Sequence, residues 1–449
     1  MLGRRHGTKA AAATLFALAL VVVSACTNDD PSAEPTGDGG DVAGDSTGVT
    51  EDPSAEPAGD STGVTDDTIK IGWPRLDQAA LIEAGLVTDI GDVNALAQSV
   101  VDDWNAEGGI NGRQVELVVR SFGADIANVL PDMQRVCLEL AEDEQVFAIV
   151  AVAWFGDAVT CVAGDHDMPL VSGTSMSNNV LETGDNNVFL TNFAWEDALR
   201  SAVRVVDDAG ELDDFEKIGV FGPLEPGMRE AIDNGLVPAL EEAGTELAED
   251  GTVPFSVTPD AAAVSAVVSR FKTEGVDAVF ATGNFFINGA FMTEAERQGY
   301  RPTYVMSDLS EGTDDLILRF APAAQLENAI GASWKGKPPD PVPTEEGQAC
   351  VETYAPDASS TTVEIGSAQT CQLLDLVRQG LEAAGDTPTR EGFLEGMAAI
   401  GTFTTSGGGE GSFGPDDHTM PDQVRLVRFD LAGCECWTAE GDDWVDVDG

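Results

Sequence analysis

Apolar and polar positions between residues 69 and 120 predict a strand, an amphipathic helix and a second strand. The first strand is the short apolar run 69–73, IKIGW. The helix follows, because Leu96, Val100, Val101 and Trp104 form one stripe at 3.6-residue spacing. Gly108 and Gly109 end it, since glycine adopts the left-handed conformation of a helix C-terminus. A strand–helix–strand unit of this length indicates a parallel sheet with a right-handed crossover.

The alternation of strands and helices continues along the chain. Predicted strands cover 69–73, 114–120, 146–152, 168–172, 217–222, 277–282 and 303–307, and predicted helices cover 129–143, 229–243, 260–275 and 288–299. Further on, the pattern favours a strand at 329–334, helices at 363–384 and 390–399, a Gly-rich turn at 407–414 and a strand at 423–431. The roughly 380 residues after 67 exceed one small domain, so we expect an α/β protein of two similar lobes. Ligands of such sheets bind beyond the carboxyl ends of the strands.

The first 67 residues lack this alternation. Basic residues Arg4, Arg5 and Lys9 precede an apolar run over 10–23, which predicts a signal peptide at 1–25. Val23-Ser24-Ala25-Cys26 resembles the lipobox of bacterial lipoproteins, which implies lipidation of Cys26; a plain signal peptide with a chance cysteine is the alternative. Residues 26–67 are acidic and rich in Gly, Ser, Thr and Pro, so we expect a disordered tether.

Charge and cysteine content narrow the class of protein. A formal net charge of −56 excludes nucleic acid and anionic lipid as main partners, since phosphate recognition uses Lys and Arg. In an exported chain, the six cysteines after Cys26 are expected to form disulfides. Sequence proximity and element placement favour Cys137–Cys161 and Cys350–Cys371. The remaining Cys434 and Cys436 would close a strained two-residue loop, and their pairing stays open.

Residue types typical of catalysis are sparse. His166 and His418 are the histidines of the mature chain, and Asp165-His166-Asp167 is interpreted as a solvated turn because adjacent residues cannot all face one ion. Gly407-Gly408-Gly409 lacks the GK[ST] of a phosphate loop, and the chain holds no G-x-S-x-G elbow. We therefore predict no enzyme activity, no metal and no cofactor.

Several segments together resemble the extracellular solute-binding receptors of branched-chain amino-acid transporters, which are type I periplasmic binding proteins. These are IKIG, VVDDWNAEGGINGRQVELVVRSFGAD, AIVAV, MPLVSGTS, KIGVFG and GVDAVFATGNFFINGAFMTEAERQGY. The resemblance spans roughly residues 68 to 445 and implies two Rossmann-like lobes joined by a three-crossover hinge. We assign 68–190 and 337–405 to lobe 1, and 191–336 and 406–449 to lobe 2. The resemblance also implies a monomer that hands a small-molecule solute to an ABC permease and its ATPase subunits, and the lipobox-like leader implies export and a lipid anchor at the outer face of the cytoplasmic membrane.

In that family the solute lies between the lobes, so the resemblance places the site at the strand ends. Lobe 1 would contribute Pro74, Arg75, Asp77, Gln78, Trp154, Phe155, Gly156, Ser172, Thr174 and Ser175, and lobe 2 would contribute Glu225, Pro226, Asn284, Phe285 and Asp308. The hydroxyl groups and nearby helix N-termini suit a carboxylate. Asp308 suits an ammonium group.

Each assignment has a structural alternative. Ser172, Thr174 and Ser175 are also typical helix caps, Trp154 and Phe155 also suit a core, Arg75 also suits a pair with Asp77, and Asp308 also suits a solvated surface. The leading hypothesis is a receptor that captures a small polar solute, such as an amino acid or amide, and delivers it to an importer. The alternative is a binding protein of the same form that signals to a membrane receptor.

Overall fold

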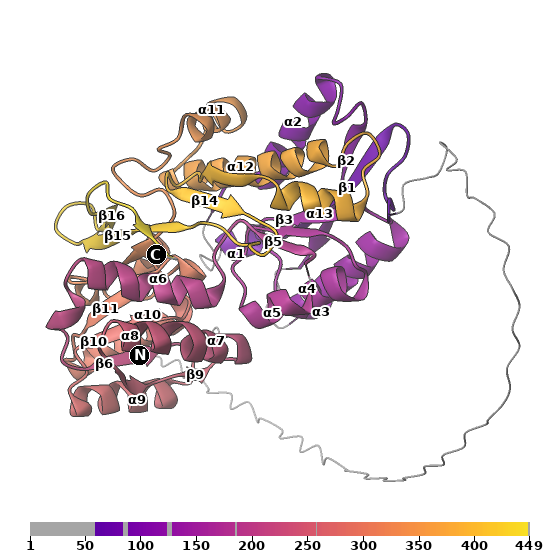
Figure 1. The fold of residues 1–449 in the computed structure, drawn as a ribbon. Helices are drawn as coiled ribbons and strands as arrows, with labels where there is room; N and C mark the ends of the chain where they lie inside the picture. Colours follow the sequence, from indigo (N-terminus) through magenta and orange to yellow (C-terminus); the bar gives the residue numbers. More distant parts are fainter. Residues whose placement is uncertain (1–58, 84–88, 124–127, 185, 257, 448–449) are drawn as a thin grey trace, which may run out of the picture. The chain divides into compact units, whose positions relative to one another are not determined.

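The computed structural model describes residues 59–83, 89–123, 128–184, 186–256 and 258–447 (Figure 1). The predicted signal peptide, Cys26 and most of the predicted tether lie outside these ranges. Within them, no helix is long and apolar enough to cross a membrane.

Lobe 1 is built on a parallel sheet with strand order β2-β1-β3-β4-β5. Its strands are β1 (Thr68–Leu76), β2 (Gln114–Phe122), β3 (Ala148–Ala151), β4 (Leu170–Ser172) and β5 (Val188–Leu190). Helices α2 (Val93–Ala106), α12 (Thr361–Ala383) and α13 (Arg390–Ala398) pack on one face, and α3 (Val129–Leu138) and α4 (Asp157–Val159) on the other. Helices on both faces explain why the four residues of β3 are all apolar and buried.

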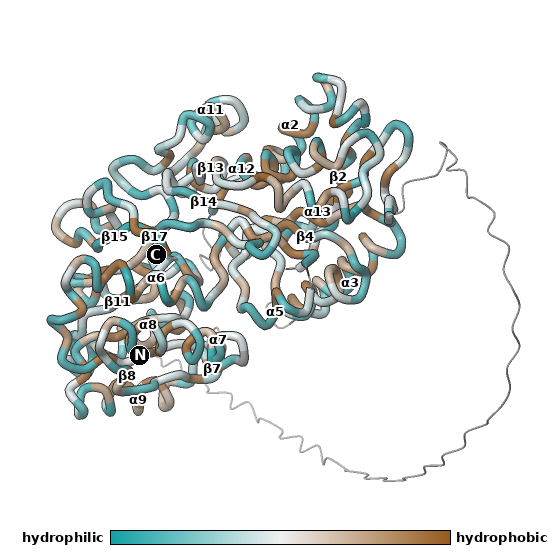
Figure 2. The backbone as a smooth tube through the Cα atoms, in the orientation of Figure 1, coloured by the Kyte–Doolittle hydropathy of each residue, from teal (hydrophilic) through white to brown (hydrophobic). Residues whose placement is uncertain are grey.

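Lobe 2 has a larger sheet with strand order β16-β15-β12-β11-β10-β6-β8. Its strands are β6 (Ile218–Phe221), β8 (Leu247–Asp250), β10 (Ala278–Ala281), β11 (Thr303–Ser307), β12 (Ile330–Ser333), β15 (Gln423–Asp430) and β16 (Cys436–Ala439). Helices α6 (Trp195–Asp208), α7 (Pro226–Ala231) and α8 (Val237–Glu242) cover one face, and α9 (Ala261–Glu274) and α10 (Phe285–Gln298) the other. Figure 2 shows hydrophobic positions along the strands and hydrophilic positions in the turns.

The chain crosses between the lobes in three segments of the described structure. The first joins β5 to α6, the second joins β12 to α11 (Glu345–Tyr354), and the third joins β14 (Glu410–Phe413) to β15. The first and third run side by side, because Leu190 N donates to His418 O at 2.8 Å and Met420 N donates to Leu190 O at 3.1 Å. Two parallel-sheet lobes with this connectivity confirm the predicted fold class.

Two predicted domain boundaries need correction. Residues 401–420 were assigned partly to lobe 2, but β13 (Gly401–Thr404) and β14 form a hairpin whose Phe413 packs in the lobe 1 core, 5.1 Å from Phe189. The passage into lobe 2 therefore follows Met420. Residues 59–67 were assigned to the disordered tether, but they are ordered against lobe 1, where Asp60 pairs with Arg390 at 2.7 Å.

The disulfides follow the predicted pairing. Cys137–Cys161 and Cys350–Cys371 are bonded, each with Cα atoms 6.4 Å apart, and they confirm the prediction. Cys434 and Cys436 are also joined, which closes the question that the sequence left open.

Candidate functional site

The parallel strands of each lobe end at one edge of the sheet, and the predicted site residues lie at or just beyond those ends. In lobe 1, β1 ends with Arg75 and Leu76. Pro74 is buried, Arg75 is half-buried and Asp77 is exposed. The buried Nε of Arg75 has no hydrogen-bond partner, and no carboxylate of the described residues pairs with its guanidinium. The alternative pairing of Arg75 with Asp77 is therefore wrong.

Hydroxyl groups fasten the loops after β3 and β4 to each other. Thr174 Oγ1 accepts from Trp154 N at 3.0 Å and donates to Val152 O at 3.3 Å. Ser172 is buried, and its Oγ accepts from Thr174 N at 3.2 Å. These two hydroxyls are thus engaged within lobe 1, and neither caps a helix. Ser175 is half-buried, and its hydroxyl has no partner among the described residues.

Trp154 lies in the core of lobe 1, which corrects the prediction that its ring lines a ligand site. Its side chain is fully buried, its Nε1 donates to Ala158 O at 3.0 Å, and its ring meets Phe122 edge-on at 5.8 Å. The bulky ring after β3 fills the space between the sheet and α3. Phe155 is half-buried against the same core, beside Gly156 at the start of α4.

In lobe 2, Asn284 and Phe285 also have structural roles. Asn284 is the N-cap of α10, and its Oδ1 accepts from Phe286 N at 3.1 Å and from Ile287 N at 3.2 Å. Phe285 is buried and stacks on Phe320 at 5.1 Å, so its ring is part of the core and not a ligand wall. Phe286 is half-buried next to it.

Asp308 does not present a free carboxylate, which corrects its predicted role as an ammonium ligand. It is 4% exposed, and its Oδ2 accepts from Ser333 Oγ at 2.6 Å and from Trp334 N at 2.9 Å. Burial raises the pKa of Asp308, but Lys337, Lys335 and the side-chain hydrogen bonds of Ser333 and Thr313 outweigh it and hold the pKa well below its usual range. A saturated carboxylate of this kind fixes structure and leaves no oxygen for a solute.

Glu225 has a carboxylate without a hydrogen bond or ion pair among the described residues. It precedes α7 in the loop after β6 and is half-buried, and its side chain neither caps the helix nor pairs with a cation of the described residues. Burial raises its pKa above the usual value. A half-buried carboxylate without a partner has oxygens available to accept hydrogen bonds. The side chain of the adjacent Pro226 lies outside the described structure.

Glu311 is a second carboxylate without a hydrogen bond or ion pair among the described residues, and residue spacing did not predict it. It follows β11 by four positions, and its φ of 61° is left-handed, a conformation that non-glycine residues rarely adopt. Loss of water around the carboxyl group raises the pKa of Glu311. The neighbouring Asp314 also raises this pKa, while Lys335 lowers it. Its side chain nevertheless remains exposed. In the sequence, an acidic residue directly before Gly312 in SDLSEG indicates a turn with a carboxylate beyond β11. Residues with a strained backbone are enriched at functional sites, so this position was a candidate.

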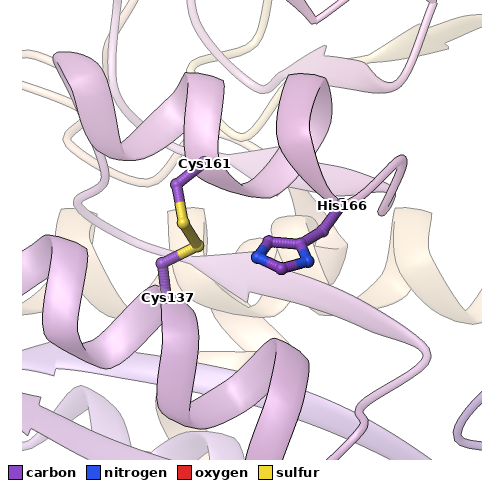
Figure 3. Close-up of side chains that lie close together, drawn as sticks. All are labelled: Cys137, Cys161 and His166. Atoms are coloured by element: carbon purple, nitrogen blue, oxygen red, sulfur yellow. A yellow bond between two sulfur atoms is a disulfide. The ribbon is translucent and has the colours of Figure 1, made fainter.

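One cluster outside the strand ends has metal-ligand chemistry (Figure 3). Ligand atoms of Cys137, Cys161 and His166 lie within 4.8 Å of one another. The two sulfurs are bonded to each other, and Glu142 lies 3.9 Å from His166 Nε2. A disulfide leaves one imidazole and one carboxylate, fewer than the four ligands of a structural zinc site. We assign no metal to the cluster.

The structure therefore brings together Trp154, Ser172 and Thr174, but no hydrogen bond or ion pair of the described residues joins a predicted lobe 1 residue to a predicted lobe 2 residue. Among the described residues, the charged side chains at the strand ends without a hydrogen bond or ion pair include half-buried Arg75 in lobe 1 and Glu225 and Glu311 in lobe 2. This pattern suits reversible binding and contains no nucleophile paired with a base.

Comparisons with known proteins agree with this reading. The family model of periplasmic binding proteins matches residues 81–435. Among solved structures, the branched-chain amino acid transporter substrate-binding protein of Streptococcus pneumoniae, in complex with isoleucine, is similar at 20% identity and a TM-score of 0.61, covering 83% of this chain and 99% of that one. A solute-binding protein of an ABC transporter from R. palustris, in complex with 4-hydroxybenzoate, is similar at 15% identity and a TM-score of 0.65, covering 85% and 97%. A leucine-binding protein of Thermotoga maritima shares 15% identity with a TM-score of 0.64, covering 85% and 99%.

No curated protein matches the chain. At these identities the solved structures establish the fold, while the family model spans most of the sequence. The chain belongs to the periplasmic binding protein family, and it is a binding protein with no enzymatic role.

Proposed function

We propose that this protein is an extracytoplasmic receptor that captures a small polar solute between its lobes and delivers it to an ABC importer. The observation that carries the proposal is the set of unpartnered charges at the strand ends of a periplasmic binding protein. The chain has 79 acidic and 23 basic residues, yet half-buried Arg75 pairs with no carboxylate of the described residues. In lobe 2, Glu225 and Glu311 leave two carboxylates free.

The charges favour a solute that carries both acceptor groups and N–H donors. Arg75 would bind an acceptor group such as a carboxylate or carbonyl, and the free acids would bind N–H donors. An amino acid, an amide or a related compound carries both kinds of group. The isoleucine bound by the Streptococcus pneumoniae protein belongs to this class, which supports the assignment.

The leader and the family support a location and a set of partners for the receptor. A basic and apolar leader and the lipobox-like Val23-Ser24-Ala25-Cys26 support lipid attachment at Cys26, with 27–58 as the spacer. The receptor would then stay at the outer face of the cytoplasmic membrane and contact an ABC permease, whose ATPase subunits drive import. Mass spectrometry of the mature N-terminus tests the anchor, because lipidation removes 1–25 and adds acyl mass to Cys26.

A thermal-shift screen of the purified receptor tests binding. Amino acids, amides, urea-like compounds and small carboxylates are the candidates, and a ligand at 100 times its Kd adds about 2.7 kcal/mol to the free energy of unfolding. No shift with any polar solute would contradict the proposal. For a positive solute, uptake by cells with and without this gene separates delivery to an importer from signalling.

A further inference from the structure

Two helix starts from opposite lobes meet beside the first crossover. Helix α5 (Asn178–Thr183) follows β4 in lobe 1, and α7 follows β6 in lobe 2. Next to the crossover the chain is held by backbone bonds, such as Trp195 N to Met176 O at 2.9 Å. Farther along the seam the lobes are joined by a side-chain bond, from Asn179 Nδ2 to Glu230 Oε1 at 3.2 Å. A rotation that opens the lobes would break the second kind of contact first.

Gly227 leaves no room for a side chain at this seam. A Cβ on Gly227 would lie 2.8 Å from Ser177 Oγ, 3.1 Å from Ser177 Cβ and 3.1 Å from Trp195 Cζ3. Gly227 lies in a helix without a positive φ, so the backbone itself does not require glycine. Trp195 belongs to lobe 2, as Gly227 does, and its ring contacts the added Cβ. The Ser177 hydroxyl can turn away, but its Cβ is held by bonds on either side, from Trp195 N to Met176 O and from Asn178 N to Glu196 Oε2, so relief must displace the start of α5 from α7.

Ser177 adds an opposing effect at the same contact. It is 1% exposed, and its Oγ has no hydrogen-bond partner in the described structure. A buried hydroxyl without a partner costs free energy, because it has lost its water and gained nothing in return. Separation of α5 from α7 would let water reach this oxygen. Ser177 thus favours separation of α5 from α7, while Gly227 permits their contact.

We propose that the Ser177–Gly227 contact sets the balance between open and closed lobes. Gly227 is a positioning residue that lets the lobes meet, and the unpaired hydroxyl of Ser177 keeps the empty closed form from being too stable. The inference rests on the proposed function in one respect, namely that the lobes close around the solute when it binds. A ligand would then shift an equilibrium between open and closed lobes that already exists in its absence.

Distances between spin labels on the two lobes test the proposal without any ligand. The full chain carries Cys26→Ser, with labels at Ala106→Cys in α2 and Glu274→Cys in α9, both exposed positions. Gly227→Ala should move the distance distribution toward the open population, and Gly227→Leu should move it further. Ser177→Ala should shift it the opposite way. Adding Ser177→Gly to Gly227→Ala should restore much of the closed population.

Two further measurements separate closure from folding. Gly227→Ala should keep or slightly raise the unfolding midpoint, since alanine favours a helix more than glycine does. Gly392→Ala in α13 and Ser269→Ala in α9 are matched controls away from the seam, and their distances should not change. Unchanged distances in Gly227→Ala and Gly227→Leu would overturn the proposal. Because no solute is used, a failed ligand screen would contradict the receptor assignment and leave this result standing.

Discussion

Asp308 Oδ1 lies 3.1 Å from Lys337 Nζ, and both side chains are buried. Asp308 directly follows β11, while Lys337 belongs to the second crossover, so the ion pair ties the end of the lobe 2 sheet to a hinge segment. Lys337 Nζ also donates to Thr313 O at 2.9 Å, and Thr313 Oγ1 hydrogen-bonds Asp308. The network explains why this acid is structural, although it stands where a ligand residue was predicted.

Asp308→Asn should lower the free energy of unfolding by about 3–5 kcal/mol, because it leaves the Lys337 charge buried without a partner. The pKa of Asp308 is lowered in the fold, so its stabilising contribution is present above about pH 4 and is lost as the pH falls further. Urea unfolding of wild type and variant from pH 7 to pH 3 measures the difference. A gap that stays constant down to pH 3 would contradict the ionised pair.

Arg390 holds the start of the described chain to lobe 1. Its Nε donates to Phe147 O at 3.0 Å, its Nη2 donates to Val146 O at 3.1 Å, and its Nη1 pairs with Asp60. Arg390→Ala should destabilise the protein by about 3 kcal/mol, since the buried carbonyls of Val146 and Phe147 lose these donors. Removal of 26–58 should lower the free energy of unfolding little, and removal of 26–67 should lower it about as much as Arg390→Ala does.

Arg297→Ala, at a pair with Glu294 whose guanidinium is exposed, is the control and should leave the unfolding midpoint unchanged.

The three disulfides should differ in their contribution to stability. Cys137–Cys161 and Cys350–Cys371 close segments of 24 and 21 residues, so replacing either pair with serine should cost about 3 kcal/mol. Cys434–Cys436 is separated by 2 positions and should matter less in the chain-entropy description. Unfolding midpoints of the three double-serine variants rank them. A larger loss for Cys434–Cys436 than for the others would contradict the ranking.

The fold was predictable because parallel strands covered on both faces are continuous apolar runs. The predicted helix 260–275 agrees with α9, which ends where Gly275 takes the left-handed conformation. Helix α10 begins three residues before its predicted start, because the Asn284 side chain caps it there. Helix α6 was missed, although Leu199, Val203 and Val206 form its buried stripe.

The site was less predictable, because position along a strand does not fix what a side chain contacts. Asp308 and Glu311 lie three residues apart in one loop, but only Asp308 meets Lys337, which comes from a later segment. Trp154 and Phe285 follow strands as ligand residues do, yet their rings turn into the cores. Such outcomes depend on tertiary contacts that residue spacing does not encode.

Glu196 should make stability depend on pH in the opposite sense to Asp308. It is 2% exposed, and burial raises its pKa, as do Asp197 and Glu230. A folded pKa above the unfolded value means that stability increases as the pH falls from 7 toward about 4. Glu196→Gln keeps an acceptor for Asn178 N and removes the buried charge. It should raise the midpoint at pH 7 and flatten this dependence; a lower midpoint at pH 7 would contradict the assignment.

Glu225 and Glu311 should determine how the receptor responds to solute charge. With a solute from the thermal-shift screen that bears an ammonium group, Glu225→Gln or Glu311→Gln should weaken binding about 10-fold or more, as expected for a charge-assisted hydrogen bond worth at least 1.5 kcal/mol. The same changes should affect an uncharged amide analogue little, because an amide side chain can still accept hydrogen bonds from the N–H groups of the analogue.

Arg75→Gln should instead weaken the binding of solutes that carry a carboxylate. Titration calorimetry of each variant with both solutes measures the difference, and Glu242→Gln on the exposed face of α8 serves as the control. An equal loss for charged and uncharged solutes would show that these acids hold the loops and do not contact the ligand.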